Sequence, residues 1–232
     1  MTDEEYLNKL STIQIYCEVL LGILRHIPGG KIINDKELIQ KLKFENKDDH
    51  LRLRACIDLI EDTEFAILEF HENGLETKSC FSGEHYLRLY GILNALYLQM
   101  QAVIDLIELF KIPNKKQIMR DLKTLEIIDV RNKVGAHTTN YSNDFKDSRN
   151  KSESYRVSQN SISKWGEEIV LVSSYNQIEK YNLVPLINQF SDKINSYLKL
   201  ICDKAIKSLY KNESENKSWL IYRLSYARYK SE

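Results

Sequence analysis

The sequence predicts an all-α fold in a single domain spanning residues 1–232, and three observations support this prediction. First, the chain contains only 8 Gly and 3 Pro, so residues that break helices are scarce. Second, apolar residues recur at spacings of three and four over long segments, which is the pattern of helices with one buried face. Third, alternation of apolar and polar residues is confined to one short stretch, so we expect a single small β-hairpin.

The composition is that of a globular protein, with 43% hydrophobic and 28% charged residues. Lys+Arg and Asp+Glu are equal at 33 each, so the chain lacks the basic excess of a typical duplex-DNA binder. Any contact with nucleic acid must therefore depend on a local group of residues.

Location and metal content are predicted from what the sequence lacks. The four cysteines are scattered, with no CxxC pair and no histidine at the spacing of zinc ligands, so reduced thiols and no metal site are expected. The opening MTDEEYLNKL is acidic and does not resemble a signal peptide. We also expect no membrane span, because no apolar run approaches ~20 residues. The sequence therefore predicts a cytoplasmic protein.

Residues 1–75 are expected to form N-terminal helices. The apolar spacing predicts one helix from Asp3 to His26 and another from Leu51 to His71, with a short helix between them. The dipeptide Asn73-Gly74 is a stop signal for the second of these helices.

Residues 82–141 are expected to form the core helices. Ser82 opens the longest predicted helix, which continues to about Lys111. Pro113 then interrupts the chain, and one further helix is predicted to contain Ile118 and to continue to Val130.

The remaining chain is expected to contain a loop, a hairpin and two helices. Residues 138–154 are polar and without periodicity, which is typical of a loop. Residues 154–173 are predicted to form a β-hairpin with its turn near Lys164–Glu167. Residues 177–232 are predicted to form C-terminal helices, with Pro185 near the first turn of the longer one.

One stretch, Asp129–Tyr141 (DVRNKVGAHTTNY), gathers a permanent cation, an amide and a titratable imidazole: Arg131, Asn132 and His137. On a regular helix the arginine and the histidine would be rotated by about 600°, so their faces would differ by about 120°. They converge only if the helix ends near Gly135, or if a two-fold axis brings two copies of the stretch together.

An arginine and a histidine in this arrangement suit cleavage of RNA. The guanidinium stays charged and matches phosphate oxygens, while an imidazole with a pKa of ~6.5 can move a proton near neutrality. His137 would take the proton of the 2′-hydroxyl or protonate the leaving 5′-oxygen. Arg131 would stabilise charge on the phosphoryl oxygens, and Asn132 would orient the sugar or the histidine. This chemistry requires no metal or other cofactor.

A structural role explains the same residues. Arg131 would then pair with Asp129 or with the acidic group Asp58–Glu64, and His137 would cap the last carbonyls of the helix. The other histidines occur near helix ends or in polar connections, where we expect them to face solvent: His26, His50, His71 and His85.

The stretch RNKVGAH resembles the R-x4-6-H motif of the HEPN superfamily, in which a polar residue commonly follows the arginine. The order of elements is also similar, because a long helix carrying NALYLQMQAVIDL is followed by a break and by the helix that ends in the motif. The resemblance covers mainly Ser82–Tyr141. It implies an HEPN-like helical bundle, here with extra N-terminal helices and a hairpin insertion.

The same resemblance implies a homodimer in which two motifs form one composite site. It assigns Arg131 and His137 as catalytic residues and Asn132 as their polar companion. The leading hypothesis is therefore a metal-independent endoribonuclease that leaves a 2′,3′-cyclic phosphate. Such an enzyme would act in a toxin or defence system, with a cognate antitoxin or another regulator as a partner.

Two alternatives from other classes stay open. One is a non-catalytic, dimeric HEPN-like interaction module, which the aromatic segment Trp219–Tyr229 and the neutral net charge favour. The other is a module that binds a nucleotide in the same cleft. Some members of the superfamily bind without cleaving, so the resemblance is compatible with each of these functions.

Overall fold

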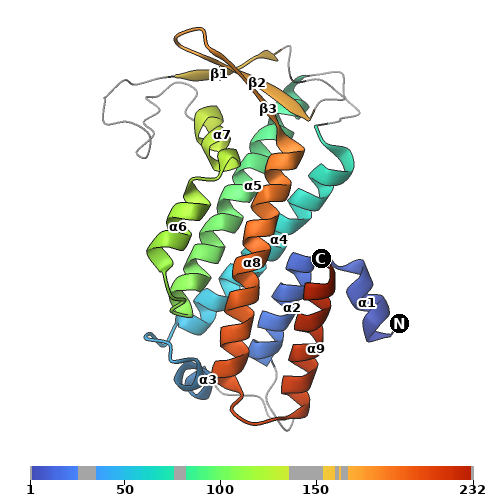
Figure 1. Cartoon of the computed structure of the whole chain (residues 1–232), viewed down its shortest axis with the longest axis vertical. Helices are drawn as coiled ribbons and strands as arrows, with labels where there is room; N and C mark the ends of the chain where they lie inside the picture. Colours follow the sequence, from blue (N-terminus) through green and yellow to red (C-terminus); the bar gives the residue numbers. More distant parts are fainter. Residues whose placement is uncertain are drawn as a thin grey trace. The chain divides into compact units, whose positions relative to one another are not determined.

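The computed structural model describes residues 2–25, 35–75, 82–135, 154–159, 162 and 167–230. These residues are predominantly helical and include a small antiparallel sheet, which confirms a mainly α fold (Figure 1). The chain divides into two compact units, each assembled from segments that are distant in sequence. The first unit is Met1–Glu64, Leu98–Lys116 and Asp192–Glu232, and the second is Phe65–Tyr97 and Gln117–Ser191.

The first unit begins with two helices where the sequence predicted one. The helix expected from Asp3 to His26 is divided into α1 (Asp3–Lys9) and α2 (Thr12–Arg25), and His26 lies outside the described residues. A capping box explains the break. The backbone N–H of Gln14 donates to Ser11 Oγ at 3.1 Å, and the N–H of Ser11 donates to Gln14 Oε1 at 2.8 Å.

Two further helices, α3 (Asp35–Leu42) and α4 (Asp49–Asn73), follow in the order predicted. The carboxylate of Asp49, the first residue of α4, accepts the backbone N–H groups of Glu45 at 3.1 Å and Asn46 at 3.0 Å, and so fixes the turn that leads into the helix. Gly74 ends the helix with a φ of 54°, a left-handed conformation that glycine adopts without steric penalty. The predicted stop signal is therefore confirmed.

The longest helix described, α5, extends from Ser82 to Leu109, as predicted. By length and composition alone, α5 could cross a membrane, which the sequence analysis did not expect. Within Gly83–Leu109, however, 67% of the most apolar 18-residue stretch is buried inside the protein. A core helix of a soluble protein has the same properties.

The C-terminal helices are α8 (Leu183–Leu209) and α9 (Glu215–Lys230). Pro185 lies in the first turn of α8, where its missing N–H leaves no helical hydrogen bond unmade. In the first unit, α9 lies beside α2 (Figure 1). The aromatic C-terminal segment thus packs on the helices of its own chain.

Two short helices take the place of the single helix that was predicted to contain Ile118 and Val130, and the second of them carries the start of the motif. They are α6 (Lys115–Lys123) and α7 (Glu126–Gly135). At the break the hydroxyl of Thr124 donates to the carbonyl of Arg120 at 2.9 Å, so the last turn of α6 ends on a side-chain hydrogen bond. Neither Gly nor Pro marks this break in the sequence.

The predicted hairpin is part of a larger sheet. Its strands β1 (Tyr155–Val157) and β2 (Glu168–Ser173) pair antiparallel as expected. A third strand, β3 (Ile178–Asn182), pairs with β2 on its other side, so the sheet order is β1-β2-β3. The prediction of helices from residue 177 onward was therefore wrong for these five residues, where Tyr181 had been assigned to the helical repeat.

The sheet has one buried and one open face. The buried side chains alternate along the strands as the pleat requires: Tyr155, Val157, Ile169, Leu171 and Tyr181. Within the second unit, α7 lies next to β1 (Figure 1). This contact places the motif helix against the sheet.

Candidate functional site

Helix α7 carries the first two residues of the motif on its more open side. Val130 and Val134 are 0% and 2% exposed, so these apolar residues serve packing. Arg131 and Asn132 are half-buried. The described part of the helix reaches Gly135, and the position of the motif histidine lies beyond it.

Arg131 is held by two contacts. Its guanidinium lies over the ring of Tyr97, 4.1 Å from the ring centroid, and its Nη1 donates to Asn132 Oδ1 at 3.1 Å. Stacking of this kind stabilises an arginine by roughly 0.5–2 kcal/mol while leaving its edges available for hydrogen bonds. Tyr97 belongs to α5, so two helices of the second unit fix the guanidinium plane.

The carboxylate contacts expected from a purely structural role are not seen at Arg131. Among the described residues, no ion pair joins Arg131 to an acidic side chain; Asp129 pairs with Lys133 instead, at 3.1 Å. In the acidic group Asp58–Glu64, the side chain of Glu64 is buried and not exposed to solvent. Glu64 is only 4% exposed, and its carboxylate accepts a hydrogen bond from Gln99. The charge of Arg131 is therefore not neutralised by the described part of the chain.

Among the described residues of the motif, Lys133, which the sequence analysis did not single out, has the most contacts. Its Nζ donates to Glu179 Oε2 at 2.7 Å and to the Tyr181 hydroxyl at 2.9 Å, in addition to its ion pair with Asp129. The same Nζ lies 4.9 Å from the centroid of the Tyr155 ring. Lys133 thus joins α7 to both outer strands of the sheet.

Lys133 and its partners Asp129, Glu179 and Tyr181, here called the Lys133 cluster, form an ion-pair network. Burial alone lowers the pKa of Lys133, but the hydrogen bonds with Glu179 and Tyr181 and the charge of Asp129 outweigh burial, so the pKa is raised well above its usual value. Burial and the hydrogen bond to Glu179 raise the pKa of Tyr181 to about 12. Lys133 therefore stays protonated and cannot serve as a general base.

The third predicted site residue, His137, lies outside the described residues, as does the predicted loop up to residue 153. The structure thus brings Arg131 and Asn132 together. It provides no geometry for the imidazole.

The expectation that the other histidines face solvent was wrong for His85. This residue is 8% exposed in the first turn of α5, and its Nε2 has no hydrogen-bond partner within the described part of the chain. His71 is exposed near the end of α4, as expected, while His50 is half-buried.

Across the described ranges, no group of three or more His, Cys, Asp or Glu side chains could hold a metal ion. The cysteines seen there, Cys17, Cys56 and Cys202, are buried free thiols.

Comparisons with protein-family models, with curated proteins and with solved structures gave no match. The site must therefore be interpreted from its own geometry.

A signal for the Lys133 cluster is present in the sequence. Asp129 and Lys133 have the spacing of a helical ion pair, and Lys133 precedes the buried Val134. The partners Glu179 and Tyr181 could not be found in this way, because the strand that carries them was assigned to a helix.

Proposed function

We propose that this protein is a metal-independent endoribonuclease of the HEPN type. The observation that supports the proposal best is the state of Arg131, whose charge has no carboxylate partner among the described residues and whose plane is fixed by Tyr97 and Asn132. A positioned, uncompensated guanidinium suits the stabilisation of negative charge on a phosphate. Lys133, on the same helix, differs from Arg131 because its charge is neutralised by ion pairs with carboxylates.

In the proposed reaction the 2′-oxygen of a ribose attacks the adjacent phosphorus, and the bond from phosphorus to the 5′-oxygen breaks. His137 takes the proton of the 2′-hydroxyl or gives a proton to the leaving 5′-oxygen. Arg131 binds the phosphoryl oxygens as their charge grows, and Asn132 holds Arg131 in place. The products are a 2′,3′-cyclic phosphate and a 5′-hydroxyl end.

A second copy of the chain would complete the site. The face of α5 beside Tyr97 carries an exposed strip in which Leu87 and Tyr90 are 72% and 40% exposed and Gly91 and Asn94 are also exposed. Packing of two such strips would exclude water from apolar side chains and place a second Arg131 near the first.

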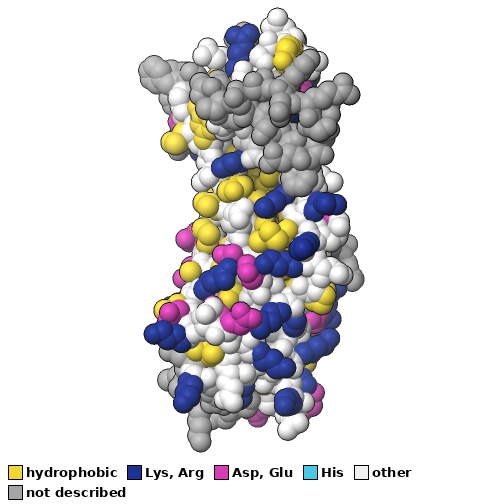
Figure 2. Space-filling view, turned by 90° about the vertical axis from the view of Figure 1, so that its left-hand side faces the viewer, with side chains coloured by type: hydrophobic (Ala, Val, Ile, Leu, Met, Phe, Trp, Pro, Cys, Tyr) yellow, Lys and Arg dark blue, Asp and Glu magenta, His cyan; other side chains and the backbone are white. Residues whose placement is uncertain are grey.

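Positive charge near the motif is local. On α6, next to α7 in the chain, Arg120 and Lys123 are exposed. Figure 2 views the side on which α6 lies and shows Lys and Arg side chains interspersed with Asp and Glu. The described residues on this side therefore form no broad positive surface of the kind that binds a duplex through its phosphates.

The deciding experiment compares RNA cleavage by the wild type, Arg131→Ala and His137→Ala in the presence of a chelator. We expect both variants to lose at least a hundredfold in rate while circular dichroism and thermal unfolding stay unchanged. Undiminished cleavage by His137→Ala would refute the assignment. If the wild type never cleaves RNA and Arg131→Ala unfolds or dissociates the protein, the interaction module is the better description.

A further inference from the structure

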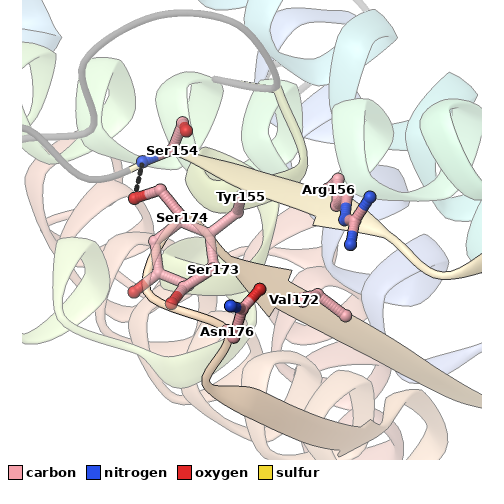
Figure 3. Close-up of a pocket in the computed structure, with 7 residues that line it drawn as sticks. All are labelled: Ser154, Tyr155, Arg156, Val172, Ser173, Ser174 and Asn176. Carbon is pink, nitrogen blue, oxygen red and sulfur yellow. Dashed lines mark hydrogen bonds between the residues drawn. The ribbon is translucent and has the colours of Figure 1, made fainter.

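A hollow lies at one end of the sheet, separate from Arg131. Its volume is about 440 Å³, and it is lined by the residue before β1 and by residues of β1, β2 and the turn that follows β2: Ser154, Tyr155, Arg156, Val172, Ser173, Ser174 and Asn176. In Figure 3, Ser154 and Ser174 lie at one end of the hollow, and Arg156 and Val172 lie at the other. All seven residues belong to the second unit.

The lining of the hollow carries a cation and no carboxylate. Arg156 is exposed on the open face of the sheet, opposite Val172, and forms no ion pair within the part of the chain that the structure describes. Its neighbours in β1, Tyr155 and Val157, are buried, so the strand fixes the position from which the guanidinium extends. The net charge of the lining is therefore positive.

The other polar groups of the hollow are held by the backbone of the turn. The N–H of Ser174 donates to the carbonyl of Ser154 at 2.8 Å, and the N–H of Ser154 donates to Ser174 Oγ at 3.4 Å (Figure 3). Ser173 Oγ accepts the N–H of Tyr175 at 3.1 Å. Asn176 is left-handed, with a φ of 58°, and its amide is exposed. Hydroxyl and amide donors are thus grouped with one guanidinium.

The hollow is connected to the motif helix through one residue. Tyr155 lines the hollow and also receives Lys133 Nζ of α7, 4.9 Å from its ring centroid. Because Tyr155 points to the buried face of the sheet and Arg156 to the open face, a ligand at Arg156 would lie on the opposite side of the sheet from the helix that bears Arg131.

We propose that this hollow binds the sugar-phosphate backbone of a single RNA strand, with Arg156 as the charged contact to a phosphate at one end and the hydroxyls of Ser154 and Ser174 as donors to the backbone at the other. A guanidinium with surrounding hydroxyl and amide donors is the chemistry that recognises phosphate without reading sequence. The inference rests on the proposed function only in taking RNA as the ligand. It adds a contact remote from the scissile phosphate, which would hold the strand while Arg131 acts on it.

The test measures binding of a labelled, single-stranded 2′-O-methyl oligoribonucleotide, which cannot be cleaved because it lacks the attacking hydroxyl. Fluorescence anisotropy is followed between about 50 and 200 mM salt for the full-length wild type, Arg156→Gln and the control Lys180→Gln. Lys180 is an exposed cation on the same face of the sheet but outside the hollow.

We expect Arg156→Gln to weaken binding roughly tenfold, as for loss of a charged hydrogen bond. The slope of log K against log salt should fall by about 0.7, the value for one phosphate of a single strand. Lys180→Gln should change both quantities less. Equal effects of the two substitutions, or an unchanged slope for Arg156→Gln, would overturn the inference.

Two further experiments test the site and its ligand. The variant Ser174→Glu places a carboxylate in the hollow while Arg156 is left unchanged, and it should also weaken RNA binding. Unimpaired binding by this variant would contradict the site. Inorganic phosphate is then titrated in place of RNA. If it binds as tightly as the oligonucleotide and depends equally on Arg156, the ligand is a free anion and the RNA assignment fails.

Cleavage of unmodified RNA is measured separately, so the two proposals can fail independently. A protein that binds RNA through Arg156 but never cleaves it refutes the ribonuclease and leaves this inference standing. A protein that cleaves RNA while Arg156→Gln binds normally refutes only the phosphate site.

Discussion

Arg131 and Lys133 lie two positions apart on α7, and their surroundings give these two cations opposite roles. Arg131 stacks on a tyrosine and contacts an amide, so its charge is available. The side chain of Lys133 is 9% exposed and has two carboxylates and a tyrosine hydroxyl around its Nζ. In the proposed function Arg131 binds a phosphate, whereas Lys133 holds α7 against the sheet.

Replacing Lys133 by Met should destabilise the protein by about 3 kcal/mol, because Asp129 and Glu179 would lose their ion pairs with the Lys133 ammonium group. Urea unfolding of the variant and the wild type measures this loss. Lys180→Met, at an exposed position, is the control and should change stability by less than about 0.5 kcal/mol. A similar loss in both variants would contradict the role of the network.

The buried carboxyl of Glu64 is expected to make the stability of the protein depend on pH. Burial raises the pKa of this carboxyl above its usual value, although the hydrogen bonds from Ser11 and Gln99 oppose the shift. A raised folded-state pKa means that the stability contributed by Glu64 is complete below its unfolded pKa. That contribution is lost as the pH rises through the folded pKa. Gln99 Oε1, which has no partner among the described residues, can accept a proton from the neutral carboxyl.

Glu64→Gln should therefore be more stable than the wild type at neutral pH, and the difference should shrink as the pH falls. The slope of this difference cannot exceed about 1.4 kcal/mol per pH unit for one proton. Thermal unfolding of both proteins between mildly acidic and neutral pH measures it, with the exposed Asp62→Asn as the control. A difference that does not change with pH would show that Glu64 is ionised throughout.

At the scale of elements, the sequence predicted α4, α5 and α8 well because each has a long apolar repeat and a clear start or stop signal. The break between α1 and α2 was missed, although Ser11 and Gln14 have the spacing of a capping box. Strand β3 was missed because Tyr181 fits the apolar spacing of the helix that follows. Short strands depend on pairing with distant residues, and one sequence does not specify that pairing.

The contact between α2 and α9 depends on one small residue. A Cβ added to Gly22 would lie 2.8 Å from Trp219 Cζ3 and 2.9 Å from Leu220 Cδ2. Gly22→Ala should therefore destabilise the protein by about 1–2 kcal/mol, because overpacking outweighs the gain in helix propensity. Chemical unfolding measures this loss, and Gly83→Ala, where a Cβ meets no atom within 4 Å, serves as the control. Stability equal to that of the control would show that α9 adjusts without cost.

For the whole molecule, the motif provides at most half of the proposed site. The sequence identified Arg131 and Asn132, and the structure brings these two residues together. Neither the approach of His137 nor the Arg156 hollow could be predicted from spacing, because the first depends on the chain after α7 and the second on the pairing of β1 with β2. The proposed second copy of the chain is consequently the feature that most needs a direct test.

Gly91 allows such a test, because it lies in the exposed strip of α5 and a Cβ there would meet no atom of its own chain within 4 Å. In a monomer, Gly91→Ala should stabilise the helix by up to about 1 kcal/mol. If the strips of two copies pack closely, the same methyl group should weaken association by roughly tenfold. Sedimentation velocity over a range of concentrations measures the dimer, with Gly83→Ala as the matched control. Because a monomer gains stability from the methyl group and only a close interface loses from it, unchanged dimerisation in Gly91→Ala would place any interface elsewhere.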